Sequence, residues 1–310
     1  MQAIRVHEFG DPEVLLLEDQ PTPQPVDDEV LVRVQAAGVN PFETYVRSGD
    51  YAQLPPLPYT PGVDAGGLLV ETGERVYTSG SLSGTYAEFA LCSRDQVHLL
   101  PDKLSYAQGA ALGVAYETAH RALLQRARPA PGESVLVHGA SGAVGLAAVQ
   151  FALAADLRVA GTAGSGAGRE LIRSQGAALA FDHRDPGHLA DAAEAVGGGF
   201  DVIIELLANE NLGDDFTALA MRGRVVVVGS RGTVNVNPRD LMNVEGTVLG
   251  MLSFHATAAE EQETHAAIAA GLRDGSLHPV VAREFPLAEA ARAHRHLMER
   301  PALGKVVLVP

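Results

Sequence analysis

The sequence predicts an α/β protein in which a doubly wound parallel sheet accompanies a smaller, mostly β domain. Three observations indicate this class. A glycine-rich turn follows an apolar, partly β-branched run at 134–137 and opens a helix. Strand-like and helix-like runs then alternate to about residue 252. The N-terminal third instead contains short strands separated by dense turn residues.

The turn after the strand at 134–137 has the composition of a pyrophosphate site. Gly139, Gly142 and Gly145 stand three residues apart and lead into a helix that we expect to run to Ala155. Glycines at such positions permit a tight turn, let phosphate oxygens approach the backbone and let the helix pack closely on the strand. The helix dipole also favours an anion there. Because any tight strand-to-helix turn favours glycine, the dinucleotide interpretation depends on the elements that follow.

Those elements continue the alternation that a dinucleotide-binding sheet requires. Apolar residues of the first helix, at Val144, Ala148, Phe151 and Ala155, recur at helical spacing and predict one stripe packed on the sheet. Further strands are expected at 157–162, 178–181, 201–204, 225–228 and 246–252, with a helix at 171–175. Carboxyl ends of strands are where doubly wound folds bind ligands.

The remaining segments predict the second domain and its connections. Strands are expected at 1–6, 14–18, 29–35, 67–71, 74–77 and 85–90. A bent helix or helix pair at 109–126 links this domain to the parallel sheet. The tail, with helices at 260–273 and 287–299 and a strand at 306–309, is expected to fold back onto the first domain.

Composition narrows the function classes. A chain of 310 residues with a formal charge of -15 is typical of a two-domain enzyme and disfavours nucleic acid or an anionic membrane as the main partner. The apolar runs are too short to cross a membrane and the N-terminus lacks the pattern of a signal peptide, so we expect a cytoplasmic protein. Cys92 is the only cysteine, which excludes an internal disulfide and favours a buried apolar role.

A series of residue blocks runs in order along nearly the whole chain, at 38–41, 43–49, 59–62, 137–142, 161–164, 181–184, 207–211 and 228–233. Together these blocks resemble one family, the zinc-independent, zeta-crystallin-like quinone oxidoreductases of the medium-chain dehydrogenase/reductase superfamily. The resemblance implies a GroES-like catalytic domain at 1–111 and 255–310 around a Rossmann domain at 112–254, with the cofactor in the cleft between them. It also implies an NADPH:quinone reductase that forms a homo-oligomer, either a dimer or a tetramer.

The resemblance leaves two other functions open. The same metal-free cleft could deliver hydride to a polarised double bond, as in an NADPH-dependent enone or alkenal reductase. A non-enzymatic structural or RNA-binding role is also known in the family. The acidic balance argues against RNA, as does a shortened turn at 71–74, where relatives carry a longer loop with lysine.

Zinc is not expected. Zinc-dependent relatives supply a cysteine and a Gly-His-Glu motif as ligands, whereas the matching places here hold Asn40 and Gly62-Val63-Asp64. The structural cysteine lobe of those relatives is also missing. The residues therefore favour hydride transfer without a metal.

The end of the second sheet strand favours NADPH over NADH. NAD enzymes usually place an acidic residue there, roughly 20 residues past the glycines, to bind the ribose hydroxyls. This chain has Thr162-Ala163-Gly164-Ser165-Gly166, which leaves room for a 2′-phosphate. Gly164, Ser165 and Arg169 could supply amide, hydroxyl and guanidinium donors. The alternative is that this run is only a flexible strand-to-helix loop.

The resemblance also implies the cofactor contacts. Matching positions are Tyr45, Ser141, Gly142, Ala143, Val144, Gly164, His183, Asn211, Val228, Gly229, Ser230, Arg231, Met251, Leu252 and Ser253. For Arg231, a guanidinium at the carboxyl edge of a sheet also suits a phosphate.

Candidate catalytic residues come from one turn at 40–45. A quinone that accepts hydride needs its developing oxyanion stabilised or protonated. Asn40 and Tyr45 could donate hydrogen bonds to it, and Glu43 could orient them or bind water. The alternatives are a structural Asn40, a solvated Glu43 and a Tyr45 packed between domains. Solvent could also supply the proton, and transfer by single electrons stays open.

Overall fold

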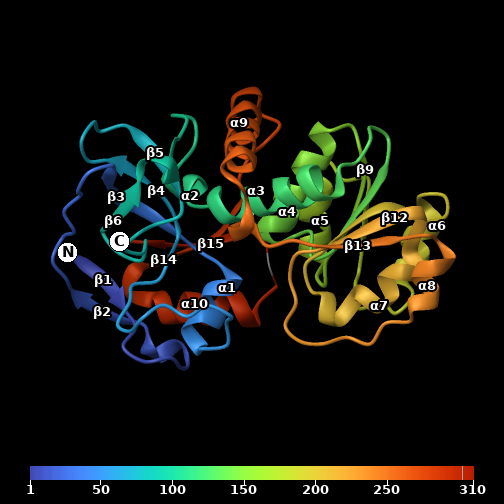
Figure 1. Cartoon of the computed structure of the whole chain (residues 1–310), viewed down its shortest axis with the longest axis horizontal. Helices are drawn as coiled ribbons and strands as arrows, with labels where there is room; N and C mark the ends of the chain where they lie inside the picture. Colours follow the sequence, from blue (N-terminus) through green and yellow to red (C-terminus); the bar gives the residue numbers. More distant parts are fainter. Residues whose placement is uncertain (302) are drawn as a thin grey trace. The chain divides into compact units, whose positions relative to one another are not determined.

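The computed structural model describes residues 1–301 and 303–310, and the chain divides into two compact units (Figure 1). Unit 1 comprises Met1–Val114, Pro279–Arg300 and Gly304–Pro310, and unit 2 comprises Ala115–His278 with Pro301 and Leu303. These units differ from the domains that the resemblance implies at residues 112–114, which lie in unit 1, and at residues 255–278, Pro301 and Leu303, which lie in unit 2. In the returning tail, helix α9 (Ala258–Asp274) therefore belongs to unit 2, and only the elements after it belong to unit 1.

Unit 1 is built on a seven-stranded sheet with the order β14-β15-β3-β4-β5-β7, in which β6 pairs with β3. The long strand β3 lies inside this sheet, between β15 and β4. Its residues Val30, Val32 and Val34 alternate along the strand and are buried, as in a strand with one face on the core. The tail strand β15 pairs antiparallel with β3, as expected for a tail that returns to this domain. A separate two-stranded sheet joins β1 and β2.

The elements of unit 1 have the following bounds. The strands are β1 (Gln2–Arg5), β2 (Leu16–Asp19), β3 (Glu29–Val39), β4 (Asp64–Leu69), β5 (Arg75–Ser79), β6 (Phe89–Ser93), β7 (Val97–Leu99), β14 (Val281–Pro286) and β15 (Lys305–Val309). The helices are α1 (Pro41–Ser48), α2 (Tyr106–Gly109) and α10 (Ala290–Glu299), with short 3-10 turns at Pro12–Val14, Arg94–Gln96 and Leu287–Glu289.

Several elements of unit 1 differ from the sequence prediction. Helices α1 and α2 and strands β7 and β14 were not predicted, and the strand expected at 85–90 begins only at Phe89. The strand begins later because Thr85 and Tyr86 form hydrogen bonds outside its pairing with β3. Thr85 Oγ1 donates to the carbonyl of Asp64 (3.0 Å), and Tyr86 N donates to the carbonyl of Pro61 (2.9 Å). Cys92 is fully buried in β6, which confirms its expected apolar environment.

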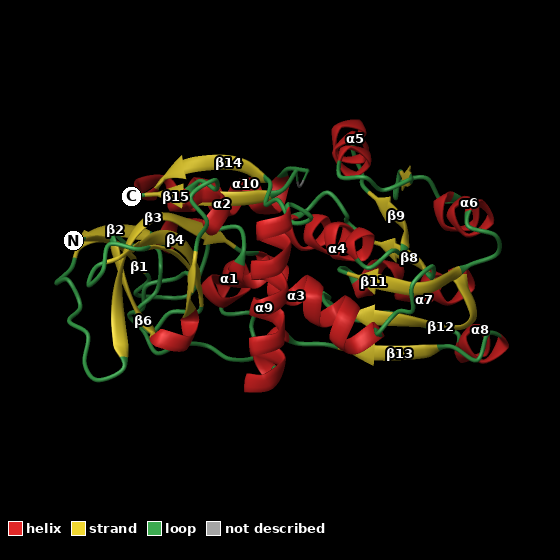
Figure 2. Ribbon diagram, turned by 90° about the horizontal axis from the view of Figure 1, so that it is seen from above, coloured by secondary structure: helices red, strands yellow, loops and turns green. Residues whose placement is uncertain are grey.

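Unit 2 is built on a parallel sheet of six strands in the order β10-β9-β8-β11-β12-β13, which confirms the doubly wound prediction. Figure 2 shows β9, β8, β11, β12 and β13 side by side in this order. The chain leaves β8 first toward β9 and later returns to its other side at β11, so the strand order reverses between β8 and β11. All carboxyl ends lie at one edge because all pairs are parallel.

The strands of unit 2 are β8 (Ser134–Val137), β9 (Arg158–Thr162), β10 (Leu179–Phe181), β11 (Phe200–Glu205), β12 (Leu219–Val227) and β13 (Thr247–Gly250). Its helices are α3 (Gly113–His120, which begins at the unit boundary), α4 (Ala143–Ala154), α5 (Gly166–Ser174), α6 (His188–Ala195), α7 (Ala208–Ala218), α8 (Pro238–Asn243) and α9 (Ala258–Asp274). A π-helical segment, Arg121–Ala127, continues α3, and a 3-10 turn covers Ser253–His255.

Helix α4 is buried on more than the single face that the sequence predicts. The whole stretch Gly145–Ala152 is buried, so this helix is enclosed on all sides. On the sheet, α6 and α7 contribute Leu189 and Phe216 to a core with Leu136 and Ile203 of the strands. Within the described residues, none of the helices is long and apolar enough to span a membrane.

Candidate functional site

The glycine turn forms an open cradle at the start of α4. Gly142 is the N-cap of that helix, and Gly139 has a positive φ of 56° that side chains rarely tolerate. A Cβ atom at Gly145 would lie 2.5 Å from Ala140 Cα and 2.6 Å from the Gly139 carbonyl oxygen. The N–H groups of the first helical turn have no carbonyl partner within the helix. The spacing of the glycines thus corresponds to a tight turn that opens α4, and the contact of its first amides with an anion stays a prediction.

The parallel sheet brings the predicted cofactor residues of unit 2 to one edge. Each group follows a different strand: Ser141–Val144 follows β8, Gly164 and Ser165 follow β9, His183 follows β10, Asn211 follows β11, Val228–Arg231 follows β12 and Met251–Ser253 follows β13. Asn40, Glu43 and Tyr45 lie in unit 1.

The segment after β9 lies against the segment after β10. A Cβ atom at Gly164 would lie 2.5 Å from His183 Nε2, so a side chain at this position would displace the imidazole. Ser165 caps α5 by accepting a hydrogen bond from Gly168 N (3.0 Å). Ser165 is therefore the N-cap of α5, and burial lowers the pKa of the neighbouring His183.

Two guanidinium groups gather on one carboxylate beside this loop. Arg169 Nη1 lies 2.8 Å and Arg184 Nη2 lies 2.9 Å from Asp182 Oδ2. Hydrogen bonds from Arg184, with the charge of Arg169, hold the pKa of Asp182 well below its usual range. Two cations on one anion leave a net positive charge that suits a phosphate.

The segments after β11 and β12 are joined by backbone contacts. Ala208 N donates to the Gly229 carbonyl (2.8 Å), and Val228 N donates to the Glu205 carbonyl (2.8 Å). A Cβ atom at Gly229 would lie 2.5 Å from the Leu206 carbonyl oxygen, so a larger residue would separate the two loops. Arg231 is held by its backbone, whose N–H donates to Asn209 Oδ1 (2.7 Å).

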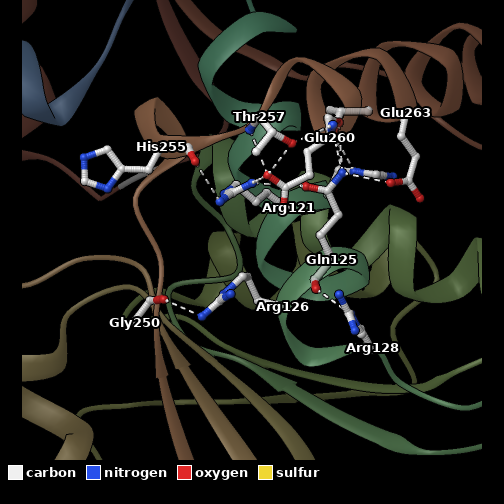
Figure 3. Close-up of polar contacts among 11 residues, drawn as sticks. Arg121, Gln125, Arg126, Arg128, Gly250, His255, Thr257, Glu260 and Glu263 are labelled. Carbon is white, nitrogen blue, oxygen red and sulfur yellow. Dashed lines mark hydrogen bonds and ion pairs between the residues drawn. The ribbon is translucent and has the colours of Figure 1, made fainter.

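The segment after β13 is anchored by the π-helical segment (Figure 3). Arg121 Nη1 lies 2.7 Å from Glu260 Oε2, and Arg121 Nη2 donates to the His255 carbonyl (3.2 Å). Arg126 Nη2 donates to the Gly250 carbonyl (3.4 Å), and Gln125 Nε2 donates to the Glu260 carbonyl (2.9 Å). The predicted cofactor segment at 251–253 therefore lies between two points that arginines hold in place.

A buried cluster in unit 2 was not predicted. His138 Nε2 lies 2.9 Å from Asp215 Oδ1 and 3.7 Å from Glu205 Oε2, and all three side chains are at most 2% exposed. Burial raises the pKa of Glu205 and that of Asp215 to about 7, and burial lowers the pKa of His138. One signal was available in the sequence: an acidic residue at 205 directly continues the apolar strand at 202–204.

The predicted turn of Asn40, Glu43 and Tyr45 in unit 1 is instead the start of helix α1. Asn40 is its N-cap, Pro41 occupies the first helical position, and Asn40 N donates to Glu43 Oε2 (2.8 Å). Asn, Pro and an acidic residue in this order are a helix-start signal that was present in the sequence. Tyr45 lies half-buried on the same helix.

Asn40 lies in a buried ion network. Its Nδ2 donates to Asp64 Oδ1 (2.9 Å), while Lys305 Nζ donates to Asn40 Oδ1 (2.6 Å). The same Lys305 Nζ lies 2.6 Å from Asp64 Oδ2, and both side chains of that ion pair are at most 2% exposed. The network was beyond prediction from spacing, because Lys305 comes from the far end of the chain.

Glu43 is buried at the wall of a pocket in unit 1, so it is not a solvated residue. The pocket has a volume of about 510 Å³, and Phe42, Val46 and Tyr59 also line it. Tyr86 Oη donates to Glu43 Oε2 (2.8 Å) and lies 3.1 Å from His294 Nε2, whereas Glu43 Oε1 has no hydrogen-bond partner among the described residues. Burial, together with the charge of Asp64, raises the pKa of Glu43 to about 7.

Comparison with known proteins shows similarity over the whole chain. Residues 26–102 match the family described as the alcohol dehydrogenase GroES-like domain, and residues 175–308 match the family described as zinc-binding dehydrogenase. The quinone oxidoreductase of Homo sapiens is 47% identical over 321 residues, covering 100% of this chain and 98% of that protein.

Solved structures are similar as well. The quinone oxidoreductase from Thermus thermophilus, also solved as its complex with NADPH, has a TM-score of 0.89 and 33% identity, with 100% of both chains covered. An NAD-dependent alcohol dehydrogenase has a TM-score of 0.93 and 27% identity, again with 100% of both chains covered.

Proposed function

This chain belongs to the quinone oxidoreductases of the medium-chain dehydrogenase/reductase superfamily, and from that premise we propose how its own residues reduce quinones with NADPH. It is an oxidoreductase that transfers reducing equivalents from NADPH to a quinone. The observation that supports this function best is the glycine cradle where the strand order of the sheet reverses.

The residues present fit NADPH. Gly145, Gly164 and Gly229 carry no side chain at the sheet edge, and a Cβ atom at each of them would meet a neighbouring atom at 2.5 Å. First-turn amides of α4, at Ala143 and Val144, would hold the pyrophosphate, and Asn211 and the segment at 251–253 would hold the nicotinamide half. When bound, NADPH supplies a hydride from its nicotinamide ring.

The preference for NADPH over NADH is attributed to the 2′-phosphate. The run 162–166 carries no acidic side chain that would bind a ribose diol or repel a phosphate. Ser165 offers a hydroxyl donor to a phosphate. The group formed by Arg169, Arg184 and Asp182 carries a net positive charge, which attracts a phosphate.

Catalysis without zinc is proposed from the ion network of unit 1. The ammonium of Lys305 lies between Asn40 and Asp64, two of the residues that match zinc-ligand motifs in relatives. A divalent cation beside this buried ammonium would meet strong repulsion, because the interior screens charge poorly. Neither Asn40 nor Val63 supplies the thiolate or imidazole that zinc prefers.

Glu43 is proposed as the proton donor for the reduced quinone. Glu43 lines the pocket, its oxygen Oε1 is buried without a hydrogen-bond partner among the described residues, and its other oxygen accepts from Tyr86 and from the backbone of Asn40. A carboxyl group with a raised pKa is partly protonated at neutral pH and can therefore act as an acid. Asn40 acts as a positioning residue through its N-cap, and Tyr45 stays a predicted donor to the substrate oxygen.

The activity itself is tested with purified protein, an ortho-quinone and either NADPH or NADH, with and without a chelator. We expect chelator-insensitive oxidation with kcat/KM at least about 10-fold higher for NADPH, since a lost phosphate contact removes at least one charge-assisted hydrogen bond. Binding of NADPH with no acceleration by any quinone, together with rapid reduction of an enone, would favour the enone reductase instead.

Replacing Glu43 with glutamine should lower kcat by about 10- to 100-fold, near or below the usual effect of a general acid, because water can still protonate the product. The native kcat should fall as pH rises through about 7, where Glu43 loses its proton. The variant E43Q should lose that fall. The exposed Glu8→Gln is the matched control, and an unchanged pH profile of E43Q would rule out Glu43 as the donor.

We also propose a cytoplasmic homo-oligomer. Strand β13 lies at the end of its sheet and pairs with β12 on one side, so its other edge could pair with β13 of a second copy. Sedimentation velocity at micromolar protein should show a dimer or tetramer, and a single monomer species would contradict the pairing.

A further inference from the structure

The buried cluster of His138, Glu205 and Asp215 lies where the strand order reverses, directly behind the proposed cofactor cradle. His138 follows β8 and immediately precedes Gly139, while Glu205 ends β11 on the other side of the reversal. Asp215 reaches the cluster from α7, the same helix that carries Asn211 one turn earlier. The three side chains therefore connect the two strands between which a dinucleotide binds.

Hydrogen bonds extend the cluster to the proposed cofactor contacts. On one side, Gly139 N donates to Thr162 Oγ1 (3.2 Å), which lies 3.4 Å from His138 Nδ1. On the other side, Glu205 Oε1 accepts from Asn211 Nδ2 (3.2 Å) and from the N–H of Leu207. The glycine turn and the Asn211 amide are thus the two ends of one buried chain of polar groups.

The charges around the cluster do not support two ionised carboxylates. Within the described part of the chain, neither Glu205 nor Asp215 forms an ion pair with a lysine or arginine. The groups that face it are His138 after β8, Thr162 of β9, His183 and His188 near β10 and α6, and Asn211 and Asp214 of α7. Two unpaired charges buried this closely would repel each other strongly.

A single proton is enough to give each polar group of the buried cluster a hydrogen-bond partner. Glu205 Oε2 and Asp215 Oδ2 are buried and lack hydrogen-bond partners among the described residues. If Glu205 carries a proton on Oε2, it becomes a donor toward Asp215, whose other oxygen accepts from His138 Nε2. His138 Nδ1 then accepts from the Thr162 hydroxyl, and every polar atom of the chain has a role.

We propose that Glu205, in its protonated form, is a positioning residue for NADPH binding that holds the Asn211 amide and the Leu207 backbone in register with the glycine turn. The inference rests on the proposed function, because it takes Asn211 as a cofactor contact. Loss of the proton places a second negative charge in the cluster, separates Glu205 from Asp215 and displaces Asn211. NADPH affinity therefore falls as pH rises and Glu205 loses this proton, because burial raises the pKa of Glu205 to about 7.

The test measures NADPH affinity of the full chain by nicotinamide fluorescence between pH 5.5 and 9. Variants are Glu205→Gln, Glu205→Ala, Asn211→Ala and the Ala/Ala double variant, with the exposed Glu194→Gln of helix α6 as control. Glutamine keeps an acceptor for Asn211 and a donor for Asp215, so E205Q should bind as tightly as native protein at pH 6 and lose the pH dependence. E205A removes the acceptor that holds the Asn211 amide, so it should bind NADPH about 10-fold more weakly, a change of the size expected for the loss of about one hydrogen bond.

The double variant separates positioning from folding. If Glu205 acts through Asn211, the Ala/Ala double variant should bind no more weakly than either single variant, with KM for NADPH raised and kcat little changed. Fully additive losses, or a pH dependence that persists in E205Q, would overturn the inference. A bound equivalent of divalent metal, with NADPH affinity lost on chelation, would overturn it too.

The result also distinguishes this inference from the function on which it rests. If N211A binds NADPH normally while the native enzyme still turns over, the positioning role fails and the quinone reductase stands. If native protein binds no NADPH at any pH, the proposed function and this inference both fail. Should E205A not fold, the pH dependence of E205Q alone decides the matter, because that variant preserves the hydrogen bonds of the cluster.

Discussion

Replacing Gly145 with valine should weaken NADPH binding by more than about 100-fold, the equivalent of losing two or more good contacts to the phosphates. Even a Cβ atom there would lie 2.5 Å from Ala140 Cα and 2.6 Å from the Gly139 carbonyl oxygen, so backbone must move. The backbone that moves is the cradle itself, because Gly139 and Ala140 form the turn. Fluorescence titration with NADPH measures the loss.

Gly187→Ala is the matched control for that variant. Gly187 precedes helix α6 with a φ of -87°, and the nearest atom to its Cβ would be Asp185 Oδ1 at 3.6 Å, an ordinary contact. It should leave NADPH affinity unchanged. A folded G145V protein, with native circular dichroism, that binds NADPH within a few-fold of native affinity would contradict the assignment of the cradle.

Replacing Lys305 with methionine should cost about 3–5 kcal/mol of unfolding free energy, the usual effect of removing one partner from a buried ion pair. Asp64 would keep its charge at 0% exposure without a cation, and Asn40 Oδ1 would lose its donor. A loss of this size is a large part of the roughly 5–15 kcal/mol that typically stabilises a folded protein. Equilibrium unfolding in urea gives the measurement.

The second variant separates charge from packing. Adding Asp64→Asn to Lys305→Met removes the stranded charge, so the double variant should regain more than half of the lost free energy. If the double variant is as unstable as K305M, the loss comes from the missing lysine side chain and not from an unpaired carboxylate.

The sequence was most informative where local chemistry dictates structure. The glycines at 139, 142 and 145 favour a tight strand-to-helix turn, and the alternating apolar runs after them predict the parallel sheet. Since parallel strands share one carboxyl edge, residues predicted singly, such as Gly164 and Asn211, lie at the same edge in the structure. The contacts to a cofactor there stay predictions.

Other features arise from contacts between residues that lie far apart in the sequence, and these could not be predicted from local patterns. The ion network joins Asn40 to Lys305, and the buried cluster joins His138 to Asp215, so no local spacing signals either one. Strand β6 starts later than predicted because Thr85 and Tyr86 bind loops outside the ladder. Helix α1 is different: its Asn-Pro start and the acidic residue at 43 were visible, and the prediction of a turn overlooked them.

The buried position of Cys92 has a chemical consequence for an enzyme of this class. Quinones are electrophiles that alkylate thiolates, so a reactive cysteine would be consumed by the substrate. The chain has a single cysteine, it is fully buried in β6, and burial raises its pKa to about 12. At neutral pH its sulfur is a protonated thiol out of reach of solvent, and thiolate is the nucleophilic form. The protein can therefore turn over an arylating substrate without inactivating itself through sulfur.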